Sequence, residues 1–525
     1  MIDTKALRQK ILDMAIKGKL VPQNPDDEPA SVLLERIRAE KQQLIKEGKI
    51  KKDKNDSIIY KGDDNRYYEK VGSEVKDITD ELPFEIPDNW VWTRLESSVL
   101  INPRNDLSDN IDVSFVEMKS ISDGYNNHFS ATTRLWKEVK SGFTHFQDGD
   151  VGFAKITPCF QNRKSVVFSG LQNGYGAGTT ELHILRAVKS TITTEYLLLF
   201  VKSSYLIERG IQKFSGTAGQ QRFGTDEVKK TPFPLPPLEE QARIVNRIDE
   251  LFEQIDIIEK NQADIDALYD EFRKRTLTLA IQGKLVPQNP NDEPASVLLE
   301  RIRAKKKAKL GKKYVDSYIY KGDDNYYYEK VGETVTNISD EISFELPENW
   351  TWCRLQTICS YIHRGKSPTY GTEKILPIIA QKCNQWAGIQ TQKCLFADRA
   401  TIAKYTEEQY LCVGDIIINS TGSGTVGRTG YIDDTLFKEY PKFVADSHVT
   451  VVRPLKCINS RYIYLFLKSP VIQTDIEAKC SGSTNQIELA TKTIQSYLIP
   501  IPPAMEQHRI VSMFFSLEAK VKDEG

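Results

Sequence analysis

The segment at residues 18–41 reads GKLVPQNPDDEPASVLLERIRAEK, and the segment at residues 283–306 reads GKLVPQNPNDEPASVLLERIRAKK. They differ only at two aligned pairs, Asp26/Asn291 and Glu40/Lys305, so 22 of 24 positions agree. Such agreement between distant parts of one chain indicates an internal duplication. The fold is therefore expected to be built twice on one plan.

Three more blocks return in the same order: YKGDDNRYY at 60–68 as YKGDDNYYY at 320–328, PFEIPDNWVWTRL at 83–95 as SFELPENWTWCRL at 343–355, and PLPPLEEQARIV at 234–245 as PIPPAMEQHRIV at 500–511. We call the repeated part the frame. The segments between the last two blocks, residues 98–232 and 357–498, diverge sharply, and we call them the inserts. A nearly identical frame around two diverged inserts suggests that the frame meets the same partner twice and the inserts meet two different targets.

A few anchors still align the inserts. Gly149-Asp150 corresponds to Gly414-Asp415, and TEYLLLFVKSS at 194–204 corresponds to SRYIYLFLKSP at 460–470. The inserts therefore share an origin even though most of their residues have changed.

A long helix is predicted after the first insert. Its apolar positions follow a 4-3 spacing, and they are Ile244, Ile248, Leu251, Ile255, Ile258, Ile265 and Phe272. This spacing is typical of a coiled-coil seam. Pro236-Pro237 followed by Glu239-Glu240 is a proper helix start, and Gly283 is a proper stop. A helix unbroken from residue 238 to residue 282 would be about 67 Å long at 1.5 Å per residue.

The seam needs a partner helix. The C-terminal segment offers Ile510, Phe514, Leu517 and Val521, and the N-terminal segment offers Leu7, Ile11, Met14 and Gly18. Together the two termini resemble one copy of the central helix cut in the middle, which predicts that they meet beside it around a pseudo-two-fold axis. The alternative is a helical linker folded onto each module.

The bulk numbers exclude several classes of protein. The net charge is −1 over 525 residues, so total charge does not indicate a nucleic-acid binder. Residues 98–237 carry 16 Lys/Arg against 13 Asp/Glu and residues 357–503 carry 16 against 12, whereas residues 238–275 carry 6 against 11. Two mildly basic modules are therefore joined by an acidic helix.

No signal peptide and no membrane span is expected, which points to the cytoplasm. The eight cysteines form no C-x-x-C pair and are expected to be free thiols.

No catalytic motif is convincing. GSGTVG at 422–427 fits G-x-G-x-x-G, but a turn and strand are expected after it in place of the helix that a dinucleotide fold requires. Gly365-Lys366-Ser367 lacks the P-loop glycine, because Ser360 stands at that position. His183 and His448 occupy matching places and are expected to be structural. No metal site, cofactor site or nucleophile is predicted.

Polar loops in the inserts are the candidate binding residues. Gln, Asn and Arg side chains can make bidentate contacts with base edges. The candidates are Lys155, Gln161, Asn162, Arg163, Lys164, Gln220, Gln221 and Arg222 in the first insert, and Arg364, Lys366, Lys382, Asn384, Ser423, Thr425, Arg428, Asn485 and Gln486 in the second. The lysine-rich stretches 46–54 and 305–313 are expected to be solvated connectors, with contact to a DNA backbone as the alternative.

The repeated P-x-x-W-x-W-x-x-L block, the two P-P-x-x-E-Q-x-x-I-V blocks and the long helices resemble the specificity subunit of Type I restriction–modification systems. The resemblance spans nearly the whole chain. It implies a mixed α/β (α+β) fold in which two target-recognition domains with β-rich cores are separated by long antiparallel coiled-coil helices, in a pseudo-two-fold internal duplication. The implied segments are a frame with the N-terminal helix at 1–97, recognition domain 1 at 98–237, the central helix at 238–283, the repeated frame at 284–356, recognition domain 2 at 357–503 and the C-terminal helix at 504–525.

The resemblance also implies a function without catalysis. The two domains would read the two halves of a bipartite site in double-stranded DNA, and the frame would bind two methyltransferase subunits, with restriction subunits outside them. S-adenosylmethionine, ATP and Mg²⁺ would be used only by those partners. Two alternatives remain at this stage, a non-catalytic tandem scaffold or adhesion protein that binds proteins, and a fused restriction enzyme with weak motifs.

Overall fold

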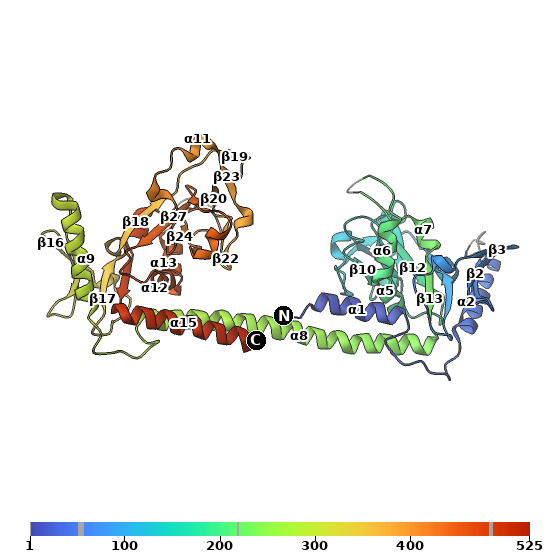
Figure 1. The fold of residues 1–525 in the computed structure, drawn as a ribbon. Coiled ribbons are helices and arrows are strands. Elements are labelled where there is room, and N and C mark those ends of the chain that lie inside the picture. The colour runs from blue at the N-terminus through green and yellow to red at the C-terminus, as the bar shows by residue number, and fades with distance from the viewer. Residues whose placement is uncertain (1, 51–56, 218–219, 482–486, 525) are drawn as a thin grey trace. The chain divides into compact units, whose positions relative to one another are not determined.

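The computed structural model describes residues 2–50, 57–217, 220–481 and 487–524. The chain divides into two compact units, Met1–Ala263 and Asp264–Gly525. The dividing point lies inside the longest helix, α8 (Leu238–Ile281), so each unit contains one half of it (Figure 1). None of the described helices is both long and apolar enough to cross a membrane. All eight cysteines are free, as expected.

Unit 1 contains, in chain order, α1 (Thr4–Ile16), α2 (Ala30–Lys46), β1 (Ser57–Lys61), β2 (Tyr67–Val71), β3 (Glu74–Asp77), β4 (Val91–Arg94), α3 (Leu95–Ser98), β5 (Val99–Ile101), β6 (Asp112–Val116), β7 (Thr132–Leu135), α4 (Trp136–Val139), β8 (Thr144–Gln147), β9 (Val151–Ala154), β10 (Ser165–Val167), β11 (Tyr175–Gly178), β12 (Leu182–Ala187), α5 (Thr194–Lys202), α6 (Ser204–Gln212), α7 (Thr225–Lys229), β13 (Pro232–Leu235) and the first half of α8.

Unit 2 continues with the second half of α8, α9 (Ala295–Leu310), β14 (Ser317–Lys321), β15 (Tyr327–Val331), β16 (Thr334–Asn337), β17 (Thr351–Arg354), α10 (Leu355–Ile358), β18 (Cys359–Arg364), β19 (Tyr370–Gly371), β20 (Pro377–Ile379), β21 (Asn384–Gln385), β22 (Gly388–Ile389), β23 (Leu395–Ala397), α11 (Arg399–Ile402), β24 (Ile416–Asn419), β25 (Thr429–Tyr431), β26 (Val444–Ala445), β27 (Val449–Pro454), α12 (Ser460–Leu467), α13 (Pro470–Lys479), α14 (Thr491–Ser496), β28 (Leu498–Ile501) and α15 (Ala504–Glu524).

The main sheets of the two inserts have the same topology although the insert sequences diverge. The main sheet has the strand order β10-β9-β12-β5 in unit 1 and β25-β24-β27-β18 in unit 2, and the strands correspond one to one. A second sheet contains one parallel pair in each insert, β6 with β11 and β20 with β26. The frame sheets also match, β1-β2-β3 with β14-β15-β16 and β4-β13 with β17-β28. The mixed α/β fold and the internal duplication are therefore confirmed. The division into six segments was a finer prediction and remains one.

A buried ion pair explains why the Gly-Asp anchor survived in both inserts. Asp150 is fully buried and accepts hydrogen bonds from Arg186 Nε at 2.7 Å and Nη2 at 2.8 Å. Asp415 is equally buried and accepts from the same two nitrogens of Arg453, also at 2.7 and 2.8 Å. A buried carboxylate needs such partners to offset its lost hydration. The anchor therefore ties the second strand of each main sheet to the third.

The frame blocks meet in one polar joint in each unit. In unit 1, Glu240 of α8 accepts hydrogen bonds from Trp90 Nε1 at 2.9 Å and from Gln23 Nε2 at 2.7 Å. In unit 2, Glu506 of α15 accepts from Trp350 Nε1 at 3.1 Å. It also accepts from Gln288 Nε2, the counterpart of Gln23, at 2.6 Å. Three repeated blocks that are distant in sequence thus share one hydrogen-bonded centre, which accounts for their common retention.

The residue after each joint glutamate attaches the insert. Gln241 accepts a hydrogen bond from the backbone N–H of Thr193 at 2.9 Å, directly before α5. Gln507 accepts the corresponding bond from Asn459 at 2.8 Å, directly before α12. The Glu-Gln pair therefore positions both the frame and the insert on the helix.

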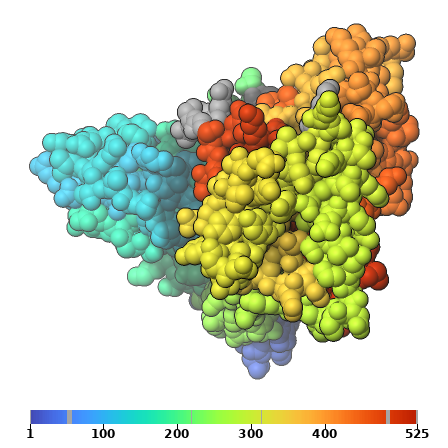
Figure 2. Space-filling view, turned by 90° about the vertical axis from the view of Figure 1, so that its left-hand side faces the viewer, coloured from blue at the N-terminus to red at the C-terminus, as the bar shows by residue number. Residues whose placement is uncertain are grey.

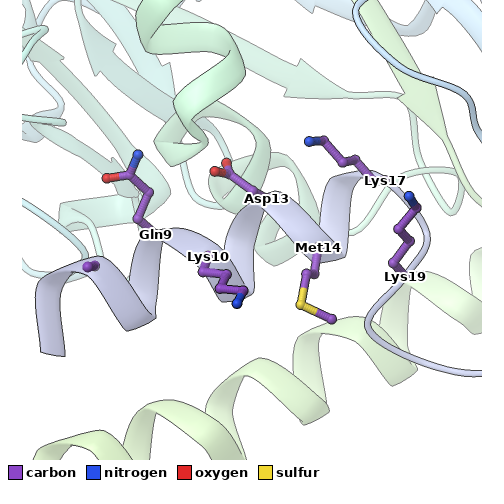
Figure 3. Close-up of a pocket in the computed structure, with 7 residues that line it drawn as sticks. Gln9, Lys10, Asp13, Met14, Lys17 and Lys19 are labelled. Atoms are coloured by element: carbon purple, nitrogen blue, oxygen red, sulfur yellow. The ribbon is translucent and has the colours of Figure 1, made fainter. Parts of the chain in front are cut away.

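Helix α1 runs antiparallel to the first half of α8. Arg8 forms an ion pair with Asp256 at 2.5 Å, and the backbone N–H of Ile2 donates to Gln262 Oε1 at 2.9 Å. Figure 3 shows Met14 pointing toward α8, while Gln9 and Asp13 point to the opposite side. There, Asp13 Oδ1 accepts from the backbone N–H of Ser204 at the start of α6. Helix α1 is thus clamped between α8 and the insert.

Helix α15 takes the corresponding place in unit 2. Glu518 pairs with Arg273 of α8 at 2.8 Å, and Ile510 and Phe514 are buried. Glu506, near the start of α15, meets Gln288 beyond the end of α8, whereas Glu518, further along α15, pairs with Arg273 within α8. The two helices therefore also run antiparallel. The pseudo-two-fold axis concerns the placement of the units relative to each other, and it stays a prediction.

The predicted seam is buried only toward the ends of α8. Ile244, Ile248 and Ile255 are buried, and the half-buried positions are Leu251, Ile258, Phe272 and, on α15, Leu517. Ile265 was wrongly placed in the seam, because its side chain is 54% exposed. Helix α1 begins beside Gln262, so Ile265 lies one turn past the segment that α1 covers. The heptad pattern continues through this point without a packed partner among the described residues.

Candidate DNA interface

Two loops lie side by side in each insert. In unit 1 the loop after β9 meets Arg222 through an isolated bridge of Ile156 with Arg222, and Arg222 also bridges Ser215. In unit 2 the loop after β24 meets Glu488 through a bridge with Thr421, and Glu488 also bridges Ser481. These loops contain most of the polar residues proposed from sequence. The structure therefore brings the two predicted clusters of unit 1 together, and in unit 2 it places the 421–428 loop at the equivalent position.

The candidates of unit 1 divide into exposed and internal residues. Gln161, Asn162 and Gln220 are exposed, and the half-buried ones are Lys155 and Gln221. Lys164 Nζ donates to the carbonyls of Ile121 at 2.8 Å and Met118 at 3.1 Å. Arg163 Nε donates to the carbonyl of Lys202 at 2.9 Å. Lys164 and Arg163 thus use hydrogen-bonding capacity to hold the loop, a role that the sequence did not reveal.

Arg222 is held by a carboxylate. Its Nη2 lies 2.9 Å from Glu181 Oε1, and the hydrogen bonds from Arg222 lower the pKa of Glu181. Arg364 in unit 2 has a comparable partner, with Nη1 at 2.9 Å from Glu488 Oε1. These two ion pairs reduce the local positive charge. Any base contact from these arginines would need the carboxylate to be displaced or shared.

One candidate in unit 2 must be withdrawn. Asn384 is fully buried, and its Nδ2 donates to Asn419 Oδ1 at 3.0 Å and to the carbonyl of Arg428 at 2.8 Å. An amide enclosed in this way is not available to a base edge. Asn384 instead fastens the β21–β22 hairpin to β24.

The other candidates of unit 2 remain near the surface. Lys366, Lys382 and Ser423 are exposed, whereas Thr425 and Arg428 are half-buried. Arg428 Nη1 donates to Gln385 Oε1 at 2.7 Å and Nη2 to the carbonyl of Gly424 at 2.9 Å. Asn485 and Gln486 lie outside the described residues. The GSGTVG segment forms a turn between β24 and β25, as expected, with positive φ at all three glycines.

Sequence reasoning missed Trp386. It lies at the tip of the β21–β22 hairpin, where its side chain is 47% exposed and Lys468 Nζ lies 5.8 Å from its ring centroid. The N-Q-W-A-G turn signal was present in the sequence and could have identified this hairpin. Lys202, the counterpart of Lys468, instead donates to the carbonyls of Gly124 and Ser165. Aligned lysines thus support different loops in the two inserts.

His183 is structural, as predicted, whereas His448 is exposed. His183 Nε2 lies 2.7 Å from the carbonyl of Phe223, and burial lowers the pKa of His183 to about 4, so the ring is neutral and donates this bond. His448 Nδ1 lies 2.7 Å from Thr421 Oγ1. Among the described residues no group of three or more His, Cys, Asp or Glu could hold a metal ion.

Figure 2 shows part of the outer surface of unit 2, where the frame sheet (yellow) and α9 (yellow-green) lie beside the insert (orange). The outer face of this sheet carries side chains that recur in unit 1. The matched pairs are Tyr60/Tyr320, Tyr68/Tyr328, Lys70/Lys330 and Val75/Val335. The paired tyrosine rings stack at 5.9 Å in unit 1 and 5.8 Å in unit 2. We call this the tyrosine face.

Comparison with known proteins identifies the family. The model described as "Type I restriction modification DNA specificity domain" matches residues 101–267 and 347–524. The Type I restriction enzyme EcoAI specificity subunit of Escherichia coli is 34% identical over 553 residues, 97% of this chain and 88% of that protein. The EcoEI specificity subunit of Escherichia coli is also 34% identical, over 555 residues with the same coverage.

A solved chain supports the fold independently. It comes from a structural study of complex assembly and conformational transition of the type I R-M system, and it aligns with a TM-score of 0.56 at 20% identity, over 84% of this chain and 93% of its own length. The scaffold and fused-enzyme alternatives are disfavoured by these relatives. Since the family model matches more than half of the chain and relatives at 34% identity span nearly all of it, the chain belongs to the family of Type I restriction–modification specificity subunits, which are non-catalytic DNA-recognition subunits.

Proposed function

We propose that the chain reads a bipartite DNA sequence, with the insert at 98–237 reading one half and the insert at 357–503 reading the other. The observation that carries this proposal is the equivalent pairing of loop segments, Ile156 with Arg222 and Thr421 with Glu488, on two inserts whose main sheets share one topology and whose sequences differ. Loops that keep their position but change their residues are suited to reading different base sequences. Exposed amides such as Gln161, Asn162 and Gln220 supply donors and acceptors for base edges.

The repeated frame supports a second part of the proposal, that two methyltransferase subunits dock on it, with restriction subunits outside them. A partner present in two copies needs the same surface twice. The tyrosine face meets this condition, because its most exposed side chains, Tyr60/Tyr320 and Val75/Val335, recur in both units. The helices α1, α8 and α15 would be the remaining docking surface and would set the distance between the half-sites.

The chain itself would contribute no chemistry. The methyltransferase partners would flip an adenine out of each half-site and methylate it from S-adenosylmethionine, and ATP and Mg²⁺ would serve only the partner subunits. The assembly would act in the cytoplasm, where the host DNA is accessible.

The test is to express the chain with the modification subunit of its own system and to map methylated adenines across the host genome. The expected result is a split motif with a fixed gap, absent when this chain is omitted. Relaxed sequence preference in one half only, when the exposed Gln161 and Asn162 are both changed to alanine, would assign that half to unit 1. A stable complex that methylates no specific motif would contradict DNA reading by the inserts.

A further inference from the structure

A half-open cavity of about 510 Å³ lies in unit 2. Its walls come from the frame strands β17 and β28, from the segment around Phe344, and from α12 and α13. Phe344, Trp352 and Phe466 give it an aromatic lining, and Val471 and Leu498 complete the apolar wall.

Unit 1 has a side chain at the corresponding place. The ring of Tyr205, at the start of α6, contacts Phe84 edge-on at 5.8 Å and lies 6.1 Å from Phe200. Its hydroxyl donates to the carbonyl of Pro232 at 3.2 Å. Tyr205 therefore occupies a site made of aromatic walls and one carbonyl acceptor.

The repeat relates the two sites residue by residue. The ungapped alignment of 194–213 with 460–479 places Phe466 opposite Phe200 and Val471 opposite Tyr205. The frame repeat places Phe344 opposite Phe84, and the equivalent strands place Leu498 opposite Pro232. The walls around the tyrosine ring are thus kept in unit 2, whereas the ring itself is replaced by the smaller valine.

The rim of the cavity differs in charge from its counterpart. Asp475 stands where unit 1 has Arg209, and it pairs with Lys479 at 3.0 Å through Oδ1. Among the described residues, neither Asp475 Oδ2 nor the hydroxyl of Tyr497 has a hydrogen-bond partner. Buried polar atoms of this kind normally find one. The lining also contains Arg354 and Lys479 beside Asp340 and Glu341, so its charges are mixed and a neutral ligand suits it better than an anion.

We propose that this cavity binds a para-substituted phenol ring, the chemistry of the tyrosyl side chain that fills the equivalent site of unit 1. The ring stacks among Phe344, Trp352 and Phe466, and its hydroxyl donates to the carbonyl of Leu498, the counterpart of the Pro232 carbonyl that accepts from Tyr205. Such a ring belongs either to a free phenolic compound or to a tyrosine of a partner protein. Unit 2 would therefore carry a binding site that unit 1 has closed with its own residue.

The test uses the full chain and p-cresol, titrated by calorimetry or by ligand-detected NMR. One saturable site is expected in the parent chain. Val471→Tyr should weaken p-cresol binding by at least about tenfold, because its ring fills the cavity as Tyr205 does in unit 1. Tyr205→Val should add a second site. Toluene should bind about tenfold more weakly than p-cresol, since it lacks the hydroxyl.

An unchanged midpoint of thermal unfolding would verify that the Val471→Tyr chain is folded. If that chain is not folded, Val471→Phe takes its place as the cavity-filling variant. Absence of saturable p-cresol binding in the parent chain would overturn the proposal, and so would equal binding by a folded cavity-filling variant. N-acetyl-tyrosinamide separates the two sources. Binding of both probes indicates a tyrosine carried on a backbone, and binding of p-cresol alone indicates a free phenol.

Discussion

At the scale of single residues, the inserts keep the interactions that fold them and change those that face outward. Asp150–Arg186 and Asp415–Arg453 have the same geometry in segments that otherwise share little sequence. Removing one member of a buried pair leaves an uncompensated charge, which typically costs about 3–5 kcal/mol. Such a cost explains why this pair survived a divergence that replaced the surrounding loops.

His183 makes the stability of unit 1 depend on pH. Burial lowers the pKa of His183 to about 4, below the value near 6.5 of the unfolded chain. As pH falls from 6.5 toward 4, the unfolded chain binds the proton first, so this contribution is complete above pH 6.5 and is lost toward pH 4. The full loss is about 3 kcal/mol. We expect the urea midpoint of unit 1 to fall over this window, and His183→Gln to flatten this decline.

The control is His448→Gln, which changes a histidine with only a surface partner and should leave the decline of the midpoint unchanged. An equal effect of both variants would contradict the assignment of this pH dependence to His183.

Glu181 is expected to restrain DNA binding. Glu181→Gln would remove the ion pair with Arg222 and leave the Arg222 cation without this carboxylate. Each additional phosphate contact steepens the dependence of log K on log salt by about 0.9. Binding to non-specific duplex DNA, measured between low and moderate salt, should therefore tighten and become more salt-dependent. Asp77→Asn, which breaks the pair with Arg66 on the frame, is the charge-matched control and should have no such effect. An unchanged slope for Glu181→Gln would place Arg222 away from the DNA.

At the scale of elements, α8 contains packed and unpacked parts of one apolar stripe. Ile255 is 4% exposed and Ile265 is 54% exposed. Ile255→Ala should destabilise unit 1 by about 2–4 kcal/mol, since it leaves a cavity beside α1. Ile265→Ala should change the free energy of unfolding by less than about 0.5 kcal/mol. Urea titrations of both variants measure the difference, and comparable losses would mean that the stripe is packed along its whole length.

The helices and the frame could be predicted because their signals are local or repeated. The start at Pro236-Pro237 and the stop at Gly283 flank a helix observed at Leu238–Ile281, and the Trp, Glu and Gln of the joint all belong to the repeated blocks. The buried seam was predicted only in part, because heptad spacing does not reveal where the partner helix begins. Ile265 has the correct spacing and lies beyond the start of α1.

The loops were harder to predict, because a polar side chain in a loop can face solvent or hold the loop together. Lys164 donates to two carbonyls, and Asn384 is enclosed by β24, yet their residue types looked the same as those of exposed Gln161 and Lys382. Composition singled out loops that the fold brings together in unit 1. Only the fold distinguishes the side chains that support each loop from those that remain available.

At the scale of the whole molecule, the frame is the part that both units share, and the residues that differ lie in the inserts that it carries. Both inserts attach through the same Glu-Gln pair and rest on the same strand pair, β4–β13 or β17–β28. Replacing residues 98–232 by the insert of another family member should therefore change one half of the methylated motif and leave the other half and the gap intact. Methylome sequencing of the chimera measures this directly. A change in both halves would refute independent reading.

The partly exposed stripe of α8 has a consequence for how this helix opens. Isolated helices fray first at their ends, but here Ile244 and Ile248 at one end and Leu277 and Ile281 at the other are buried in the two cores. The middle carries Ile257, Ile265 and Leu268 at 54%, 54% and 65% exposure. Amide protons near these residues should exchange with deuterated solvent sooner than those near either end, because local opening there breaks few contacts. In the free subunit the longest helix would then be least protected from hydrogen exchange at its centre. A partner that covers this centre would slow the exchange of those amides.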